Sequence, residues 1–305
     1  MPLLALVKGK GANGFGYGSS AEKVTEGLDL SGKVYLLTGC NSGIGYETLR
    51  ILGKRGAHVI AAARTLEKAQ DALDTSSSDG TPVACELSEP ESVRACIQTV
   101  KELGKPLDGI ICNAGIMALP KLQLQHGYEL QFFTNHIGHF ILVTGLTDQL
   151  AEEGRVVMVS SGAHFAAPEG GILFDNLKGE RFYDPWKFYG QSKLANVLFA
   201  KQLAKRFEGT GRTAYALHPG VIKTNLTRHM NPVVGFLMVA FGFLFLKSIP
   251  QGAATQTYLA TQPGIESLSG GYFKDSNPTH TSKYGRDEAM AERLWEVSEE
   301  IVSNL

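Results

Sequence analysis

The sequence lacks the features that mark several classes of protein. It has only four cysteines in 305 residues, and their spacing fits neither a disulfide framework nor a zinc site. We therefore expect no metal centre and a reducing, cytoplasmic compartment. The formal net charge is −1, so the chain offers no basic surface for nucleic acid or for an anionic membrane.

Long hydrophobic runs and internal repeats are also absent. The opening residues, 1–8, are too short for a signal peptide and lack its basic start, so we expect no leader. The longest apolar run, 232–246, has 15 residues, whereas a transmembrane helix needs about 20. What is present is a 43% hydrophobic composition, which can fill one large core.

Strand and helix patterns alternate along most of the chain, as βαβ units require. Residues 9–20 are rich in Gly and Ser, so we expect a loose N-terminal arm at 1–29 and one domain at 30–305. The expected strands are 34–38, 57–62, 82–85, 108–112, 155–160, 213–217 and 271–273, and the expected helices are 43–54, 65–73, 89–102, 126–150, 187–208, 250–261 and 286–302. This pattern predicts an α/β fold, a doubly wound seven-stranded parallel sheet with helices on both faces and a ligand crevice at the carboxyl ends of its strands.

A glycine-rich turn, with Gly39, Gly43 and Gly45, follows the first predicted strand and opens a helix. Such a turn lets the backbone approach a pyrophosphate, which then meets the N–H groups at the positive end of the helix. The spacing Gly-x-x-x-Gly-x-Gly differs from the commoner dinucleotide fingerprint. A plain turn is the alternative, but the strand–turn–helix context favours nucleotide binding.

Tyr189 and Lys193 are four residues apart where an amphipathic helix is expected to begin, so their side chains share one helical face. An ammonium beside a phenol favours the phenolate and lowers the Tyr pKa from its usual value of about 10. A tyrosine tuned in this way can transfer a proton near neutral pH. The pair alone does not exclude a half-buried tyrosine beside a solvated lysine.

Together the glycine turn and this pair resemble the short-chain dehydrogenase/reductase family, over about residues 30–280. Further family motifs follow in the same order, at 110–115, 134–140, 156–161 and 218–224, with Cys112 in place of the family's first Asn. The resemblance implies a single-domain Rossmann fold, a nicotinamide cofactor and a catalytic set of Asn135, Ser161, Tyr189 and Lys193. In that set Tyr189 is the general acid or base and Lys193 lowers its pKa and binds the nicotinamide ribose. Ser161, a better positional match than Ser160, bonds the substrate oxygen, and Asn135 acts through water.

The resemblance also implies which residues contact the cofactor. NADP(H) is favoured because Ala63 replaces the carboxylate that would bind the ribose of NAD, while Arg64 can clamp a 2′-phosphate and Lys68 can assist. NAD(H) remains an alternative cofactor for two reasons. The glycine turn adds no second basic residue, and Arg64 could be a solvated residue at a helix start. The implied contacts are Gly39, Asn41, Ser42, Gly43, Ile44, Gly45, Arg64, Glu86, Leu87, Asn113, Ala114, Gly115, Tyr189, Lys193, Pro219, Gly220, Val221, Ile222 and Thr224.

Two departures from the family bear on the substrate. Ser161 and Tyr189 are 28 residues apart, a wide gap whose extra stretch, 166–177, is expected to loop over the pocket. The apolar run 232–246 stands where the family has its substrate lid, here near 225–250. Both features are similar to the retinol-dehydrogenase-like branch and to the oxidoreductase domain of WW-domain oxidoreductases. We therefore expect an apolar alcohol, aldehyde or ketone as substrate.

Several alternatives stay open. The run 232–246 could instead dip into a membrane, giving peripheral membrane contact, or form a dimer surface. The family implies a homodimer or homotetramer packed through the Tyr189 helix. A catalytically silent nucleotide-binding regulatory protein is the alternative function, although all four catalytic-type residues are intact. We expect His136 and His139 to pack within a helix, and Trp186 and Phe188 to pack around the Tyr189 helix. His164 follows closely after Ser161 and could line the substrate pocket.

Overall fold

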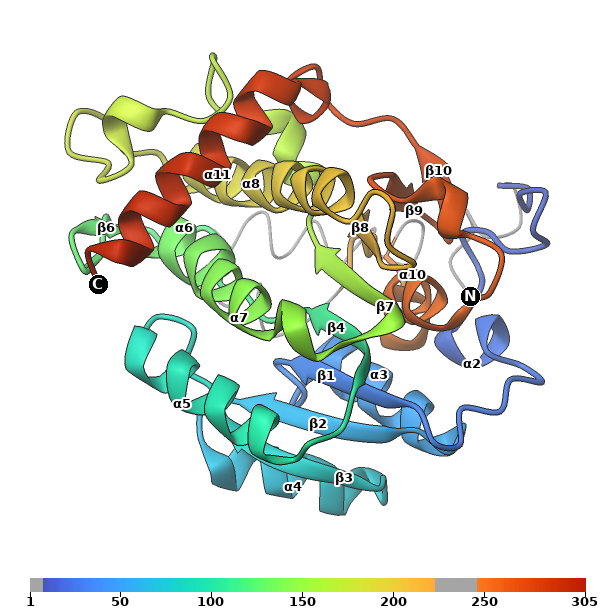
Figure 1. Ribbon diagram of the computed structural model, residues 1–305. Coiled ribbons are helices and arrows are strands. Elements are labelled where there is room, and N and C mark those ends of the chain that lie inside the picture. The colour runs from blue at the N-terminus through green and yellow to red at the C-terminus, as the bar shows by residue number, and fades with distance from the viewer. Residues whose placement is uncertain (1–7, 223–245) are drawn as a thin grey trace.

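A mostly parallel sheet of eight strands lies at the centre of the protein (Figure 1). The computed structural model describes residues 8–222 and 246–305. In spatial order the strands are β10 (Asn277–Thr279), β9 (Tyr272–Lys274), β8 (Thr213–His218), β7 (Leu150–Val159), β4 (Leu107–Cys112), β1 (Val34–Thr38), β2 (His58–Ala63) and β3 (Gly80–Ala84). The single-domain Rossmann fold expected from the sequence is confirmed.

The prediction of seven strands is wrong by one, because β9 turns back into a short antiparallel strand, β10. Asp275 and Ser276 make the turn with φ of 55° and 61°, and left-handed residues of this kind are typical of two-residue hairpins. The turn contains no glycine, so the sequence pattern did not indicate it.

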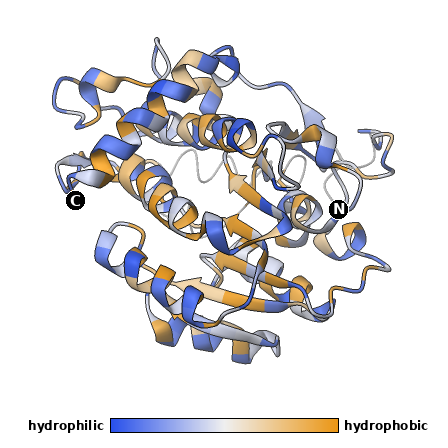
Figure 2. Cartoon of the chain, in the orientation of Figure 1, coloured by the Kyte–Doolittle hydropathy of each residue, from blue (hydrophilic) through white to orange (hydrophobic). Residues whose placement is uncertain are grey.

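Helices cover both faces of the sheet. On one face lie α3 (Gly43–Lys54), α4 (Leu66–Ser76) and α10 (Ile249–Thr261), and on the other α5 (Pro90–Glu102), α7 (Gly138–Leu146) and α8 (Pro185–Arg206). Successive residues of β1 serve opposite cores: Leu36 packs on the α8 side and Leu37 on the α3 side. A strand covered on both faces needs a continuous apolar sequence, and Figure 2 shows the central strands largely in the hydrophobic colours.

The helix predicted at 126–150 is shorter and interrupted. The short helix α6 (Leu130–Phe132) leads through a π-helical turn, Phe133–Ile137, into α7. Asn135 lies within this turn, and π-helical turns are frequent at functional sites. Because α7 ends at Leu146, β7 begins at Leu150, earlier than the predicted residue 155.

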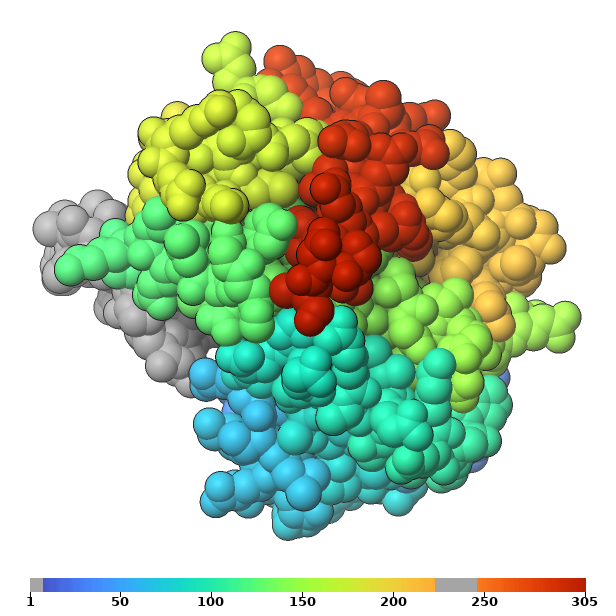
Figure 3. Space-filling view, turned by 60° about the vertical axis from the view of Figure 1, so that its left-hand side comes forward, coloured from blue at the N-terminus to red at the C-terminus, as the bar shows by residue number. Residues whose placement is uncertain are grey.

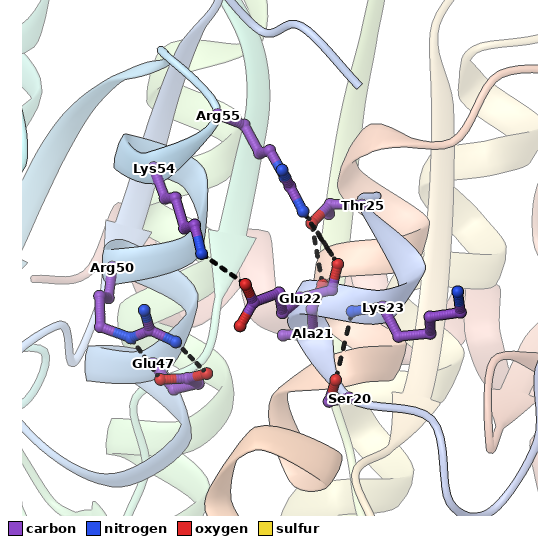
Figure 4. A network of polar contacts seen from close by, with 9 residues as sticks. All are labelled: Ser20, Ala21, Glu22, Lys23, Thr25, Glu47, Arg50, Lys54 and Arg55. Atoms are coloured by element: carbon purple, nitrogen blue, oxygen red, sulfur yellow. Dashed lines mark hydrogen bonds and ion pairs between the residues drawn. The ribbon is translucent and has the colours of Figure 1, made fainter. Parts of the chain in front are cut away.

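The N-terminal segment lies against the domain, in contrast to the loose arm that its composition predicts. The short helix α2 (Ala21–Val24) packs against α3 and α10. Figure 4 shows Arg55, at the end of α3, donating to the backbone carbonyl of Glu22 at 3.1 Å. Asn13 donates to the carbonyl of Ser276 at 2.7 Å. Hydrogen bonds to the backbone thus hold a segment that has few apolar residues.

The C-terminal helix α11 (Glu288–Ser303) covers α8, the helix through which the family would form a homodimer or homotetramer. Trp295 packs on Phe140 of α7 and Phe199 of α8, with ring centroids 5.0 and 5.7 Å apart, and Arg206 lies 3.9 Å from its ring centroid. Figures 1 and 3 show α11 lying across this face. This side of α8 is thus covered within the same chain, and the homodimer or homotetramer stays a prediction.

The stretch 166–177 packs beside α8, whereas the sequence analysis expects a loop over the pocket. Ile172 and Leu177 belong to the core on the α8 side. The backbone N–H of Leu173 donates to Oε1 of Gln191 in α8 at 2.8 Å. The two apolar side chains fix this insertion to the flank of α8.

Among residues 8–222 and 246–305, no helix is both long enough and apolar enough to cross a membrane. Thr224 and nearly all of the predicted lid lie outside these residues. The described ends of that gap lie side by side, since Ile222 pairs with Lys247 in an isolated β-bridge.

Candidate active site

The carboxyl ends of five parallel strands bring the predicted site residues to one edge of the sheet, the usual place for a ligand in this architecture. Helix α8 returns to the same edge with Tyr189 and Lys193 in its first turns. The residues that follow the five strands are Gly39 after β1, Arg64 after β2, Asn113 after β4, Ser161 after β7 and Pro219 after β8.

Tyr189 and Lys193 lie one turn apart on α8, as their spacing predicts. The helix starts at Asp184, whose carboxylate accepts two backbone N–H groups of the first turn. The Lys193 ammonium lies 5.9 Å from the centroid of the Tyr189 ring and donates to the carbonyl of Val159 at 3.0 Å. This bond fixes the active turn of α8 to the end of β7.

Burial governs the protonation of both side chains. It raises the pKa of Tyr189 to about 12, an effect that a hydrogen bond with Ser161 partly offsets, and it lowers the pKa of Lys193 to about 8. Both shifts follow from removing water around a group that would be charged. The lowered Tyr189 pKa predicted from the spacing is therefore not found, and Tyr189 is a neutral phenol, able to donate a proton, at pH 7.

The two serines at the end of β7 have different surroundings. Ser160 is buried, and its hydroxyl donates to the carbonyl of Lys193 at 2.7 Å. The Ser161 side chain lies close enough to Tyr189 to lower the pKa of its phenol, and its Oγ accepts the N–H of Ala163 at 3.1 Å. The geometry thus brings Ser161 to the tyrosine, whereas Ser160 ties β7 to α8.

Asn135 is held rigidly beside Lys193. Its Oδ1 accepts the N–H of Ile116 at 2.8 Å, and its Nδ2 donates to the Ile116 carbonyl at 2.9 Å and to Ser192 Oγ at 3.0 Å. A Cβ atom at Gly115 would lie 2.9 Å from Asn135 Oδ1 and 3.2 Å from Lys193 Nζ. All four predicted catalytic residues are therefore brought together.

The glycine turn forms a cradle that fits a dinucleotide phosphate. A Cβ atom at Gly45 would lie 2.1 Å from the Gly39 carbonyl, so only glycine lets α3 start this close to β1. The first turn of α3 contains no acidic residue, and Ser42 gives it no side-chain cap within the described chain. Its backbone N–H groups can thus meet an anion at the positive end of the helix.

A cavity of about 350 Å³ adjoins this turn. It is lined by Asn41, Ser42, Gly43, Tyr46, Lys68, Asp71, Ala72 and Thr75. Arg64 is exposed and does not line this cavity; it makes no hydrogen bond or ion pair with another described residue. The sequence pattern does not predict that Tyr46 and Asp71 line this cavity, because their proximity to the turn depends on how α3 and α4 pack.

Glu86 and Leu87 follow β3, but they face their own loop. The Glu86 carboxylate accepts from the hydroxyl of Ser88 at 3.0 Å and from its N–H at 3.3 Å. Leu87 is buried, and a Cβ atom at Gly138 would lie 2.2 Å from its carbonyl. Their described contacts are thus to the loop and to α7.

Asn113 is hydrogen-bonded to the start of the glycine turn. Thr38 and His139, which the sequence pattern does not assign to the site, belong to the same network of hydrogen bonds. Its Nδ2 donates to the Thr38 carbonyl at 2.9 Å. The Thr38 hydroxyl accepts the N–H groups of Asn113 and Ala114 at 3.0 Å each. His139 bonds both this hydroxyl, at 2.9 Å, and the Asn135 carbonyl, at 3.0 Å. His139 therefore links the cofactor turn to the catalytic asparagine.

The segment after β8 reaches the same edge. Gly220 has φ of 100°, a conformation that favours glycine. A Cβ atom at Gly252 would lie 2.2 Å from Ile222 and 2.8 Å from Ile44, so these isoleucines lie close to each other. Residues 219–222 are thus brought toward the glycine turn, while Thr224 lies outside the described residues.

Three exposed apolar side chains lie near site residues along the chain. Phe165 follows Ser161, Trp186 precedes Tyr189, and Val221 lies in the segment after β8; their exposed fractions are 61%, 45% and 52%. The rings of Trp186 and Tyr189 meet edge to face, with centroids 6.3 Å apart. Phe188 is fully buried as expected, whereas Trp186 is only half covered by its own helix.

Comparison with known proteins gives consistent matches. The short chain dehydrogenase family model matches residues 33–234. The chloroplastic short-chain dehydrogenase TIC 32 B of Brassica napus is 40% identical over the full length of both chains. Retinol dehydrogenase 12 of Bos taurus is 41% identical, covering 90% of this chain and 88% of its own.

A solved structure agrees with the fold. A putative uncharacterized protein from Mycobacterium paratuberculosis superposes with a TM-score of 0.75 at 30% identity. The match covers 92% of this chain and 97% of that protein. Sequence and structure therefore point to the same group of proteins.

Proposed function

The chain belongs to the short-chain dehydrogenase/reductase family, oxidoreductases that act on CH–OH groups with NAD(P), and from that premise we propose its reaction. The protein interconverts an apolar alcohol with an aldehyde or ketone, using NADP(H) and Tyr189 as the general acid or base. The observation that carries this proposal is the grouping of Ser161, Tyr189 and Lys193 at the edge of the sheet that bears the glycine turn. Two hydroxyls at one point can bind a single substrate oxygen from two sides.

The roles of the residues follow from their surroundings. The bound nicotinamide supplies or accepts the hydride. In reduction Tyr189, neutral at pH 7 because burial raises its pKa to about 12, donates its proton to the carbonyl oxygen as negative charge develops there. The Ser161 hydroxyl donates a second hydrogen bond to that oxygen. Lys193 places positive charge near the phenol and so stabilises the phenolate that proton transfer leaves. Asn135 lies beside the Lys193 ammonium, where its own hydrogen bonds hold it in place.

The NADP(H) preference is supported by the basic residues near the second strand. Arg64 is exposed and unpaired among the described residues, and Lys68 lines the cavity next to the glycine turn. Both can meet a 2′-phosphate, which binds guanidinium and ammonium groups strongly. Asp71 lines the same cavity and opposes a further negative charge, so NAD(H) is the alternative cofactor.

An apolar substrate is supported by the side chains around the tyrosine. Phe165, Trp186 and Val221 present exposed apolar surface, and the ring of Trp186 meets that of Tyr189 edge to face. Surface of this kind gains free energy when a hydrophobic molecule covers it. Relatives at 40–41% identity are named retinol dehydrogenases, which agrees with a long apolar alcohol or aldehyde.

Contact with a membrane is a secondary proposal. It depends on the apolar run 232–246, which lies almost entirely outside the described residues. Flotation with liposomes tests it directly, because protein that stays at the bottom of the gradient has no such contact.

The test of the reaction is NADPH oxidation by the purified protein over a panel of apolar aldehydes and ketones, with NADH assayed in parallel. Tyr189→Phe is expected to lower the rate by roughly 10² to 10⁴-fold, because it removes the general acid, while the affinity for NADPH changes little. Tyr258→Phe is the matched control, since Tyr258 lies on α10, on the opposite face of the sheet from α8.

The tyrosine assignment is wrong if Tyr189→Phe turns over within about threefold of the wild type. A rate with NADH that equals or exceeds the rate with NADPH would contradict the cofactor preference alone.

A further inference from the structure

The peptide bond that follows Ser161 is held by two histidines. Nδ1–H of His164 donates to the Ser161 carbonyl at 2.7 Å, and the N–H of Gly162 donates to Nδ1 of His218 at 3.0 Å. The carbonyl and the N–H belong to one peptide unit. His164 comes from the 3₁₀ turn Gly162–Ala166 and His218 from the end of β8, so the unit is held from two elements.

These hydrogen bonds require different tautomers. Nε2 of His164 accepts the N–H of Ser282 at 3.1 Å, so its hydrogen lies on Nδ1. In His218 the acceptor is Nδ1, because a backbone N–H can only donate, and the hydrogen lies on Nε2. Each ring must also be neutral, since an imidazolium has no acceptor nitrogen.

The surroundings of His164 favour its neutral form. The side chain is fully buried, and the Tyr272 hydroxyl of β9 lies 3.4 Å from its Nδ1. Burial lowers the pKa of His164, and the hydrogen bond to the Ser161 carbonyl opposes this only in part. No other charged group is among the causes of this shift, so burial decides its protonation.

The surroundings of His218 act in the same direction. Burial, together with the positive charges of Lys274 and Lys247, lowers its pKa to about 4, while Asp275 opposes this shift. His164 also faces this ring. The ring therefore keeps its acceptor nitrogen throughout the neutral pH range.

The direction of the Ser161 hydroxyl depends on this peptide unit. Its Oγ accepts the N–H of Ala163, the residue directly after the held unit, and it bonds Tyr189. We infer that His164 and His218 are positioning residues: as neutral imidazoles of opposite tautomers they hold the Ser161–Gly162 peptide unit and thereby keep the Ser161 hydroxyl against Tyr189. Neither ring takes part in proton transfer.

The first test does not need a substrate. ¹⁵N NMR of histidine-labelled protein, recorded from about pH 5.5 to 8, distinguishes the tautomers and the charge of each ring. We expect hydrogen on Nδ1 of His164 and on Nε2 of His218, with neither ring titrating in this range. The signals are assigned by His164→Asn and His218→Asn, or by correlation to the backbone if a variant does not fold. Titration of either ring above about pH 6, or the reverse tautomer in either, overturns the inference.

The second test rests on the proposed function and separates positioning from folding. His218→Asn keeps an acceptor and His164→Asn keeps a donor near Nδ1, whereas leucine at either position keeps neither. We expect each leucine variant to lower kcat roughly tenfold to a hundredfold, with KM for substrate and cofactor nearly unchanged and with recovery in the asparagine variant. His58→Asn is the matched control, because His58 starts β2 and pairs with Asp79 at 2.8 Å.

The outcomes are distinguishable. Leucine variants with wild-type kcat, or asparagine variants no better than leucine, contradict the positioning role. A wild-type protein that turns over no substrate contradicts the proposed function, and the tautomers seen by NMR still decide the inference about the histidines.

Discussion

At the scale of single residues, burial decides the chemistry that the sequence pattern leaves undetermined. The spacing of Tyr189 and Lys193 correctly predicts that they share a helical face, but it gives the wrong direction for the Tyr189 pKa. Sequence spacing reports which groups are near each other, whereas desolvation depends on everything packed around them. The same limit explains why Thr38 and His139, two buried polar residues at the site, were not assigned to it.

Ser160 and Ser161 allow a matched test at this scale. We expect Ser161→Ala to lower kcat roughly a hundredfold, because it removes a donor to the oxygen on which charge develops, with little change in the thermal midpoint. Ser160→Ala should instead leave the Lys193 carbonyl without its partner and lower the free energy of unfolding by about 1–3 kcal/mol. Steady-state kinetics and urea denaturation of both variants provide the measurement.

The reverse assignment would show in the same data. If Ser160→Ala lost turnover while Ser161→Ala kept it, the hydroxyl that serves the substrate would be the one on Ser160.

At the scale of elements, the pattern locates the strands and most helices but not the local irregularities. The hairpin of β9 and β10 turns on Asp275 and Ser276, neither of which is a glycine. The π-helical turn around Asn135 lies within a run that is buried on all sides, so hydrophobic periodicity does not indicate it. Both features depend on contacts between distant segments, which a single sequence does not display.

Helix α11 carries a prediction about assembly. Because Trp295 packs on Phe140 and Phe199 of its own chain, Trp295→Ala should lower the free energy of unfolding by about 3 kcal/mol. A contact within one chain does not depend on concentration, so the destabilisation caused by Trp295→Ala should be the same in dilute and concentrated protein. Trp186→Ala, at the half-exposed tryptophan, is the control and should cost much less.

A destabilisation by Trp295→Ala that depends on protein concentration would contradict this description of α11. It would indicate that Trp295 packs between chains.

At the scale of the whole molecule, the alternation of strands and helices was enough to predict the topology and the edge at which the site lies. The burial of polar groups in that architecture was not predictable. Three histidines illustrate this: burial lowers the pKa of His136 to about 3 and those of His139 and His218 to about 4. Each lies in or beside a core that forms only when the sheet is covered.

These histidines should make stability depend on pH. Above the usual histidine pKa of about 6.5 they are neutral in both the folded and the unfolded chain. As the pH falls from about 6.5 toward 4, the unfolded chain takes up protons that the folded protein does not, so the free energy of unfolding should decrease. Urea denaturation across this range measures the slope, which His136→Asn should reduce and His280→Asn, at an exposed site, should not.

The free energy of unfolding could instead stay constant or increase on acidification over this range. That result would show that the buried histidines take up protons as readily in the folded protein as in the unfolded chain.

The most direct test of the central claim is to follow the hydride itself. NADPH carrying deuterium at both C4 positions of the nicotinamide is incubated with an apolar aldehyde that the protein reduces, and the product alcohol is examined by mass spectrometry. We expect deuterium at the carbinol carbon with the wild-type protein, and a rate of transfer lower by roughly 10² to 10⁴-fold with Tyr189→Phe at unchanged NADPH affinity. Absence of label in the wild-type product, or full-rate transfer by Tyr189→Phe, would contradict the account.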